Sequence, residues 1–186
     1  GFGFRGQEAD DAWLIAADVG GKPLRFVDHV EFGATQNGRA IGRWPNGIGE
    51  LFPMVSLSFN GANSGPYFDS VVLSELHYHA AEPPAGSAVT RDELDFVEVG
   101  NRTGSSVDIS HWRLDNAVDF TFPASTVLAG NERLAIVGFD PIAAPGKATA
   151  FRQIHGMPAQ ARLLGPYTGT LDNGGEELIL DRPEDL

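Results

Sequence analysis

Cysteine is absent from the 186 residues of this chain. Disulfide bonds, thiolate metal ligands and thiol nucleophiles are therefore excluded. Long apolar runs are missing too, because no stretch approaches the ~20 apolar residues with which an α-helix crosses a bilayer. We therefore expect no membrane insertion.

Basic residues are scarce. The chain has 13 Lys and Arg against 25 Asp and Glu, which gives a net charge of -12, and the basic residues are scattered without a run of three. Phosphate backbones attract clustered Lys and Arg, so an acidic surface of this kind repels them. Nucleic acid is therefore not an expected partner.

Turn-forming residues are plentiful, with 23 Gly and 12 Pro. This content is typical of many short strands joined by tight turns. Beyond residue 70 the alternation of apolar and polar residues predicts strands at 71–79, 94–99, 106–114, 119–122, 133–137 and 177–181. We expect turns at Gly100-Asn101, at Asp115-Asn116 and at 172–175. One helix is predicted near 147–155, with Phe151 and Ile154 on one face and Gly156 as its C-terminal cap.

The first 66 residues show a different pattern. A short apolar strand ends at Asp18, Gly20-Gly21 forms a hairpin-type turn, and alternation up to Phe32 predicts a half-buried strand. Residues 33–66 are rich in Gly, Asn, Pro and Ser, so we expect a loop-dominated stretch that ends in a linker. Its apolar residues are expected to lie against a core; they are Trp44, Leu51, Phe52 and Met54.

Residues 71–186 carry an ordered series of motifs. They are Val71-Val72-Leu73-Ser74-Glu75-Leu76-His77-Tyr78-His79, Leu94-Asp95-Phe96-Val97-Glu98-Val99, Val107-Asp108-Ile109-Ser110-His111-Trp112-Arg113-Leu114, Phe120-Thr121-Phe122-Pro123, Gly169-Thr170-Leu171 and Glu176-Glu177-Leu178. In order and spacing they resemble the lamin tail domain, in the form found in large exported bacterial proteins. The family usually has Gly at the position of His111, a departure that concerns the local turn geometry.

The resemblance implies an all-β fold, an immunoglobulin-like β-sandwich with the short helix near 147–155. Residues 67–186 would form this sandwich. Residues 1–66 would be the C-terminal part of a preceding repeat plus a linker, with Trp13-Leu14-Ile15 corresponding to Leu178-Ile179-Leu180. A closing strand is missing after Leu186, so residues 22–33 are expected to complete the sandwich, either in the same chain or across a domain-swapped homodimer.

The resemblance also implies a function. We expect a non-catalytic protein-interaction or scaffolding module, secreted or on a bacterial cell surface, whose partner is a protein or a cell-surface component. The alternative is a carbohydrate-binding or calcium-stabilised accessory domain of a secreted hydrolase. No nucleophile motif, Walker loop or H-E-x-x-H sequence favours an enzyme.

Three histidines form the weak candidate set for a transition metal. His77 and His79 are two apart on a predicted strand, so both side chains would point to one side, and His111 would supply a third zinc ligand. The competing interpretation is a pair of histidines at the end of a strand with a packing role. Gly1-Phe2-Gly3-Phe4-Arg5-Gly6 matches G-x-G-x-x-G, but no strand leads into it and no helix follows, so it does not predict a dinucleotide site.

Acidic turns raise the question of calcium. Asp172 and Glu176 concentrate oxygen ligands in one turn, although no EF-hand spacing is present and acidic turns are usually only solvated. We therefore expect no cofactor, with calcium at these turns as the alternative.

Four residues are assigned structural roles. Glu98 interrupts the alternation of its strand, so we expect it to be partly buried and hydrogen-bonded as a structural anchor. Trp112 is expected in the core together with Phe120 and Phe122, because aromatic residues at sandwich positions bury a large area. No catalytic residue is predicted.

Overall fold

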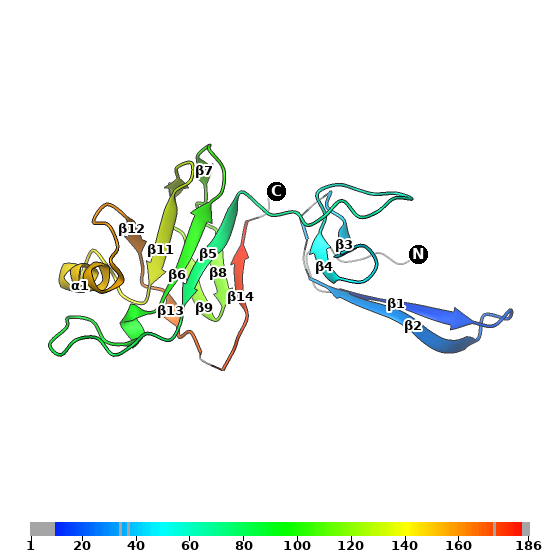
Figure 1. Cartoon of the computed structure of the whole chain (residues 1–186), viewed down its shortest axis with the longest axis horizontal. Coiled ribbons are helices and arrows are strands. Elements are labelled where there is room, and N and C mark those ends of the chain that lie inside the picture. Colours follow the sequence, from blue (N-terminus) through cyan, green and yellow to red (C-terminus); the bar gives the residue numbers. More distant parts are fainter. Residues whose placement is uncertain (1–9, 34, 37, 173, 184–186) are drawn as a thin grey trace. The chain divides into compact units, whose positions relative to one another are not determined.

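The computed structural model describes residues 10–33, 35–36, 38–172 and 174–183. The chain divides into two units, residues 1–68 and residues 69–186, which we describe separately (Figure 1). The described residues form mostly short β-strands with one α-helix, which confirms the predicted all-β class.

The first unit contains the hairpin predicted around Gly20-Gly21. Strand β1 (Asp10–Ala17) pairs antiparallel with β2 (Pro23–Phe32), and the register shifts between Leu14 and Ile15 and between Ala16 and Ala17. The carboxylate of Asp18 accepts hydrogen bonds from the backbone N–H groups of Gly20 and Lys22, at 2.9 and 3.0 Å, and so organises the turn.

A second hairpin lies where a loop-dominated stretch was expected. Strand β3 (Ile41–Trp44) pairs antiparallel with β4 (Glu50–Pro53). The prediction missed this hairpin because each strand has only four residues. With Gly42 and Arg43 in β3 and Glu50 in β4, neither strand shows a regular alternation of apolar and polar residues.

Burial in the first unit is much lower than expected. Met54, 2% exposed, is the only core hydrophobic residue among its described residues, whereas Trp13 is 51% and Phe26 69% exposed. The expected packing of Trp44 against a core is wrong, because its side chain is exposed, and β2 is half-buried only towards Phe32.

The second unit has two four-stranded sheets. The first has the order β12-β11-β6-β5, formed by Arg162–Leu164, Arg133–Val137, Phe96–Asn101 and Val71–His77. The second has the order β13-β9-β8-β14, formed by Thr168–Gly169, Val118–Thr121, Arg113–Asn116 and Leu178–Asp181. Two short strands, β7 (Val107–Asp108) and β10 (Val127–Leu128), form a separate pair. A 3-10 turn, η1 (Asp92–Leu94), precedes β6.

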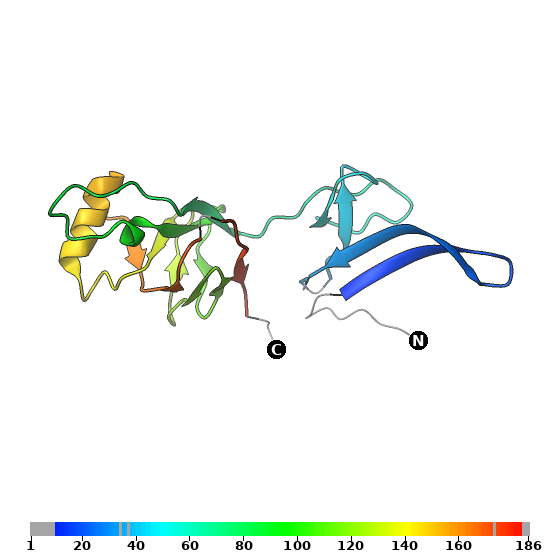
Figure 2. The same cartoon turned by 90° about the horizontal axis from the view of Figure 1, so that it is seen from below.

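Both faces of the first sheet are covered. One face shares a core with the second sheet, because Val97, Val99 and Ile136 pack in one cluster with Leu114 and Val118. The other face packs on α1 (Pro145–His155), whose Ala148 and Phe151 join Phe96 and Val137. In both views α1, in yellow, lies next to β12, in orange (Figures 1 and 2). Side chains on both faces of β6 and β11 are therefore buried, so apolar residues do not alternate regularly with polar ones along these two strands.

The helix confirms the prediction and corrects one detail. It ends at His155, and Gly156 takes the left-handed cap with φ 63°. Phe151 is 0% exposed, whereas Ile154, which was predicted on the same face of the helix, is 39% exposed.

Several strand bounds also differ from the prediction. Gly100-Asn101 is the end of β6 and not a turn. Glycine occurs there because a Cβ at position 100 would meet the Ser74 side chain at 3.1 Å. The predicted strand 106–114 is divided, since His111 adopts φ 64° between β7 and β8. Strands β10, β12 and β13 have only two or three residues each and were not predicted.

The predicted closing strand belongs to the first hairpin. Residues 23–32 form β2, which pairs with β1, and the sheets of the second unit are formed by strands from residues 71–181 among the described residues. Completion of the sandwich by residues 22–33, in the same chain or by exchange between two copies, stays a prediction.

Candidate functional site: an acidic groove beside two outer strands

The second unit has two hollows that share Tyr78, Leu171 and Asp172 in their walls. Their volumes are about 360 and about 340 Å³. We call them together the acidic groove. It is lined by residues that follow β5, by η1, by the 169–172 loop and by the start of β14.

Apolar side chains form part of the groove wall. Leu76 of β5, Leu178 of β14 and Leu171 line it, together with the ring of Tyr78. Strands β5 and β14 each stand last in their sheet among the described strands. An outer strand offers unpaired backbone groups to another strand, so hydrogen-bonding edges lie next to an apolar surface here.

The charged residues of the lining are mainly acidic. Asp92, Asp95 and Asp172 line the first hollow with Glu93, and Arg91 is the only basic residue there. Burial alone would raise the pKa of Glu93, but hydrogen bonds from Lys147 and from the Thr90 N–H lower it below its ordinary value. Glu93 is therefore already paired with Lys147. The negative charge that a ligand would meet in the groove comes from the other carboxylates.

Asp95 and Tyr167 form the inner wall of the first hollow. Burial raises the pKa of the Asp95 carboxyl, against the opposing effect of the hydrogen bond from the Ala80 N–H. Burial, with the nearby Asp95 and Asp92 carboxylates, raises the pKa of Tyr167 to about 12. The Tyr167 hydroxyl stays protonated at neutral pH and donates to the Asp95 carbonyl at 3.5 Å.

The predicted zinc ligands are not brought together. Among the described residues, no group of three His, Asp or Glu side chains is arranged to hold a metal ion. His77 is the last residue of β5, whereas His79 lies beyond the strand and is exposed. His77 instead stacks on Phe96 with ring centroids 5.6 Å apart, and its Nδ1 lies 3.7 Å from Asp95 Oδ1.

The predicted calcium turn makes local hydrogen bonds. A carboxylate oxygen of Glu176 accepts from the Asp172 N–H, and Asp172 Oδ1 accepts from the Gly174 N–H at 2.8 Å. Both residues line the acidic groove. The Gly-rich motif at residues 1–6 lies outside the described residues.

Glu98 has the partners that its position requires. Its Oε1 accepts from Ser74 Oγ at 2.7 Å and pairs with Arg133 at 2.9 Å. These contacts link β6 to the strands on both sides, and Glu98 does not line the groove. Its role as a structural anchor stays a prediction.

The three aromatic residues lie where a core was expected. Trp112 and Phe122 are buried in the cluster between the sheets, and Phe120 packs against it half-buried, with its ring centroid 5.2 Å from that of Phe122. Neither hollow of the acidic groove is lined by them.

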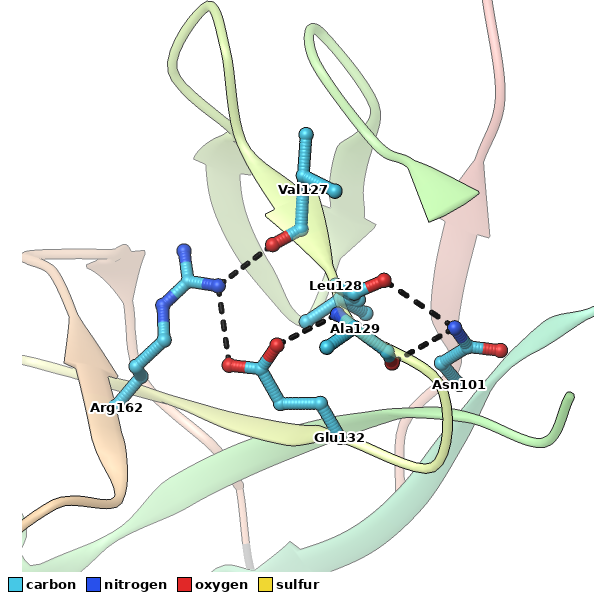
Figure 3. A network of polar contacts seen from close by, with 6 residues as sticks. All are labelled: Asn101, Val127, Leu128, Ala129, Glu132 and Arg162. Atoms are coloured by element: carbon cyan, nitrogen blue, oxygen red, sulfur yellow. Dashed lines mark hydrogen bonds and ion pairs between the residues drawn. The ribbon is translucent and has the colours of Figure 1, made fainter. Parts of the chain in front are cut away.

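A polar network around the buried Asn101 lies at the end of β6 (Figure 3). Asn101 Nδ2 donates to the carbonyl groups of Leu128 and Ala129, and Glu132 accepts from the Ala129 N–H at 2.7 Å. Arg162 binds both Glu132 and the Val127 carbonyl. The contacts connect β6, β10, the turn that precedes β11, and β12.

Sequence reasoning missed the groove itself. Tyr78, Asp92 and Tyr167 belong to no binding or catalytic motif, and they meet only because the end of β5, η1 and the segment before β13 converge. The one available signal was the acidic turn at Asp172, which was interpreted as an ion ligand.

Comparisons with protein-family models, with curated proteins and with solved structures give no match. Within the described part of the chain, no helix has the length and apolar character needed to cross a membrane.

Proposed function

We propose that residues 67–186 form a non-catalytic, immunoglobulin-like sandwich of the lamin tail type, within an exported or surface protein of a bacterium. Its function is to bind a segment of another protein along the acidic groove. The supporting observation is the groove between the outer strands β5 and β14, which combines an apolar wall with unpaired carboxylates.

The chemistry of the groove defines the ligand. An extended segment can hydrogen-bond to an outer strand, while its alternate side chains enter the neighbouring hollows. Leu76, Tyr78 and Leu178 favour apolar side chains, and Asp92 and Asp172 favour Lys or Arg. The expected ligand is therefore an extended segment that alternates apolar and basic residues.

The test uses the full chain and two fluorescent synthetic peptides. One alternates lysine with valine, and the matched control has glutamate in place of lysine. We expect saturable binding of the lysine peptide only, with an affinity that decreases as salt is added, because exposed charges are screened. Equal binding of both peptides, or of neither, would refute the proposal.

Variants locate the binding site. Asp92→Asn and Asp172→Asn each remove one groove charge, and the asparagine Oδ1 at 172 can still accept from the Gly174 N–H. Each is expected to weaken binding roughly two- to fivefold, the range of an exposed ion pair. Asp119→Asn removes the same charge at an exposed position outside the groove lining, and it should leave the affinity unchanged.

A second candidate function is carbohydrate binding, as in an accessory domain of a secreted hydrolase. It is favoured by the exposed ring of Tyr78 next to Tyr167 in the first hollow. Aromatic rings of this kind stack on apolar faces of ligands. Binding of neutral oligosaccharides that is lost in Tyr78→Ala and insensitive to salt would favour this candidate.

A further inference from the structure

The β1–β2 hairpin of the first unit presents a large uncovered apolar surface. Trp13, Leu24 and Phe26 are all exposed, and the Trp13 and Phe26 rings contact each other with centroids 5.2 Å apart. A two-stranded hairpin in water is only marginally stable without a third strand or a packing partner. Contiguous exposed apolar surface of this kind marks an interaction site.

The turn end of this hairpin carries two basic residues, Lys22 and Arg25, and one acidic residue, Asp18, whose carboxylate accepts from the backbone N–H groups of the turn. Lys22 and Arg25 flank Leu24, and Phe26 follows, so charged and apolar residues are interleaved. Among the described residues, neither Lys22 nor Arg25 has an ion-pair partner or a side-chain hydrogen bond. In a chain with a net charge of -12, two cations that lack ion-pair partners and lie three positions apart beside exposed apolar side chains are an unusual surface.

The acidic groove of the second unit has the complementary features. It offers the carboxylates of Asp92 and Asp172, neither of which forms an ion pair among the described residues, and its apolar wall includes the exposed side chains of Leu76 and Tyr78. The turn end of the hairpin thus carries basic and apolar side chains, which are the side chains expected in a ligand of the acidic groove.

We propose that the β1–β2 hairpin of one copy of this chain binds in the acidic groove of a second copy. Lys22 and Arg25 face the groove carboxylates, and Leu24 and Phe26 cover Leu76 and Tyr78. This inference rests on the proposed function of the groove, and it names a second copy as the partner. Because the two surfaces differ, the contact is head-to-tail, and each copy can both give a hairpin and receive one.

The absence of cysteine permits a direct test on the full chain. Leu24→Cys and Leu76→Cys are prepared separately, mixed, and oxidised gently. We expect a disulfide-linked dimer in the mixture and little in either variant alone, because the contact joins a hairpin to a groove. A dimer that forms as readily from Leu24→Cys alone would overturn the proposal in favour of pairing between hairpins.

Charge reversal provides the second measurement, by light scattering after size exclusion. The unmodified chain should associate as its concentration rises, and Lys22→Glu with Arg25→Glu should abolish this association. Asp92→Lys, Asp172→Lys alone should also stay monomeric, and mixing the two double variants should restore association, because an acidic hairpin then meets a basic groove and the unmodified hairpin meets an unmodified groove. A chain that stays monomeric at every concentration would refute the inference.

The lysine peptide separates the two proposals. If the Lys22→Glu, Arg25→Glu chain binds that peptide in the groove while the unmodified chain stays monomeric, the inference fails and the proposed function stands. If the peptide does not bind this variant, the proposed function fails as well.

Discussion

Asn101 and Ala129 are joined by a hydrogen bond of 2.9 Å from the Asn101 Nδ2 to the Ala129 carbonyl, although 28 residues separate them along the chain. The same amide donates to the carbonyl groups of Ser105 and Leu128, and its oxygen accepts from the Thr103 N–H. A single buried side chain therefore satisfies the backbone of two loops at the end of β6.

Replacing this amide should destabilise the second unit. Asn101→Asp keeps the acceptor for Thr103 but removes the donor, so the buried carbonyl groups lose their partner, at a cost of about 1–3 kcal/mol. The free energy of unfolding in urea measures this. Ser106→Ala, at an exposed neighbouring position, is the control and should change the stability by less than about 0.5 kcal/mol. Equal values for the two variants would contradict the role of the amide.

His111→Gly should stabilise the chain. His111 has φ 64°, a left-handed conformation that costs a residue with a Cβ about 1 kcal/mol, and its exposed side chain contributes little packing. His111→Val should destabilise it, because a β-branched residue fits this region poorly. Thermal melts of the three proteins should rank Gly above His and His above Val. Any other order would show that the backbone at position 111 leaves the left-handed conformation in the variants.

Phe151 and Ile154 should differ greatly in their contribution to stability. Phe151→Ala empties a site that is 0% exposed and should cost about 3–5 kcal/mol. Ile154→Ala removes a side chain that is 39% exposed and should cost no more than about 1 kcal/mol. Urea unfolding of both variants measures the difference, and similar losses would mean that α1 packs through a different face.

His155 should make stability depend on pH near neutrality. Burial lowers its pKa below the ordinary value, aided by His77 and opposed by the hydrogen bond to the Leu94 carbonyl and by Glu75 and Asp95. The Nε2 must carry a hydrogen to donate to that carbonyl at 3.0 Å. Because its pKa is lower in the folded chain, His155 binds a proton more tightly in the unfolded chain than in the folded one. The stabilising contribution of neutral His155 is therefore complete above the unfolded pKa of 6.5, and it is lost as the pH falls from there towards the folded pKa.

The check is a series of urea titrations between about pH 8 and about pH 5. The unmodified chain should lose stability towards the acidic end of this range. His155→Gln can still donate to the Leu94 carbonyl but does not titrate, so its stability should vary less. Identical pH profiles for the two proteins would exclude His155 as the cause.

Local patterns were sufficient for some elements and insufficient for others. The β1–β2 hairpin and α1 were predicted because Gly20-Gly21 and Gly156 mark their ends directly. Gly100 was misinterpreted, because glycine also occurs where a neighbouring strand comes close, and Ser74 belongs to a different part of the sequence. The β3–β4 hairpin lacks any alternation from which it could be inferred.

The amino-acid sequence alone determined the all-β class, the exclusion of thiol chemistry, the helix, and the need of Glu98 for hydrogen-bond partners. These properties depend on composition and on neighbours within a few residues. Only the tertiary structure decided that Tyr78, Asp92, Tyr167 and Asp172 share one groove, that Ile154 faces outward, and that Trp13 and Phe26 are uncovered. Such features depend on contacts between distant segments, and a strand's alternation shows which residues share a face but not what covers it.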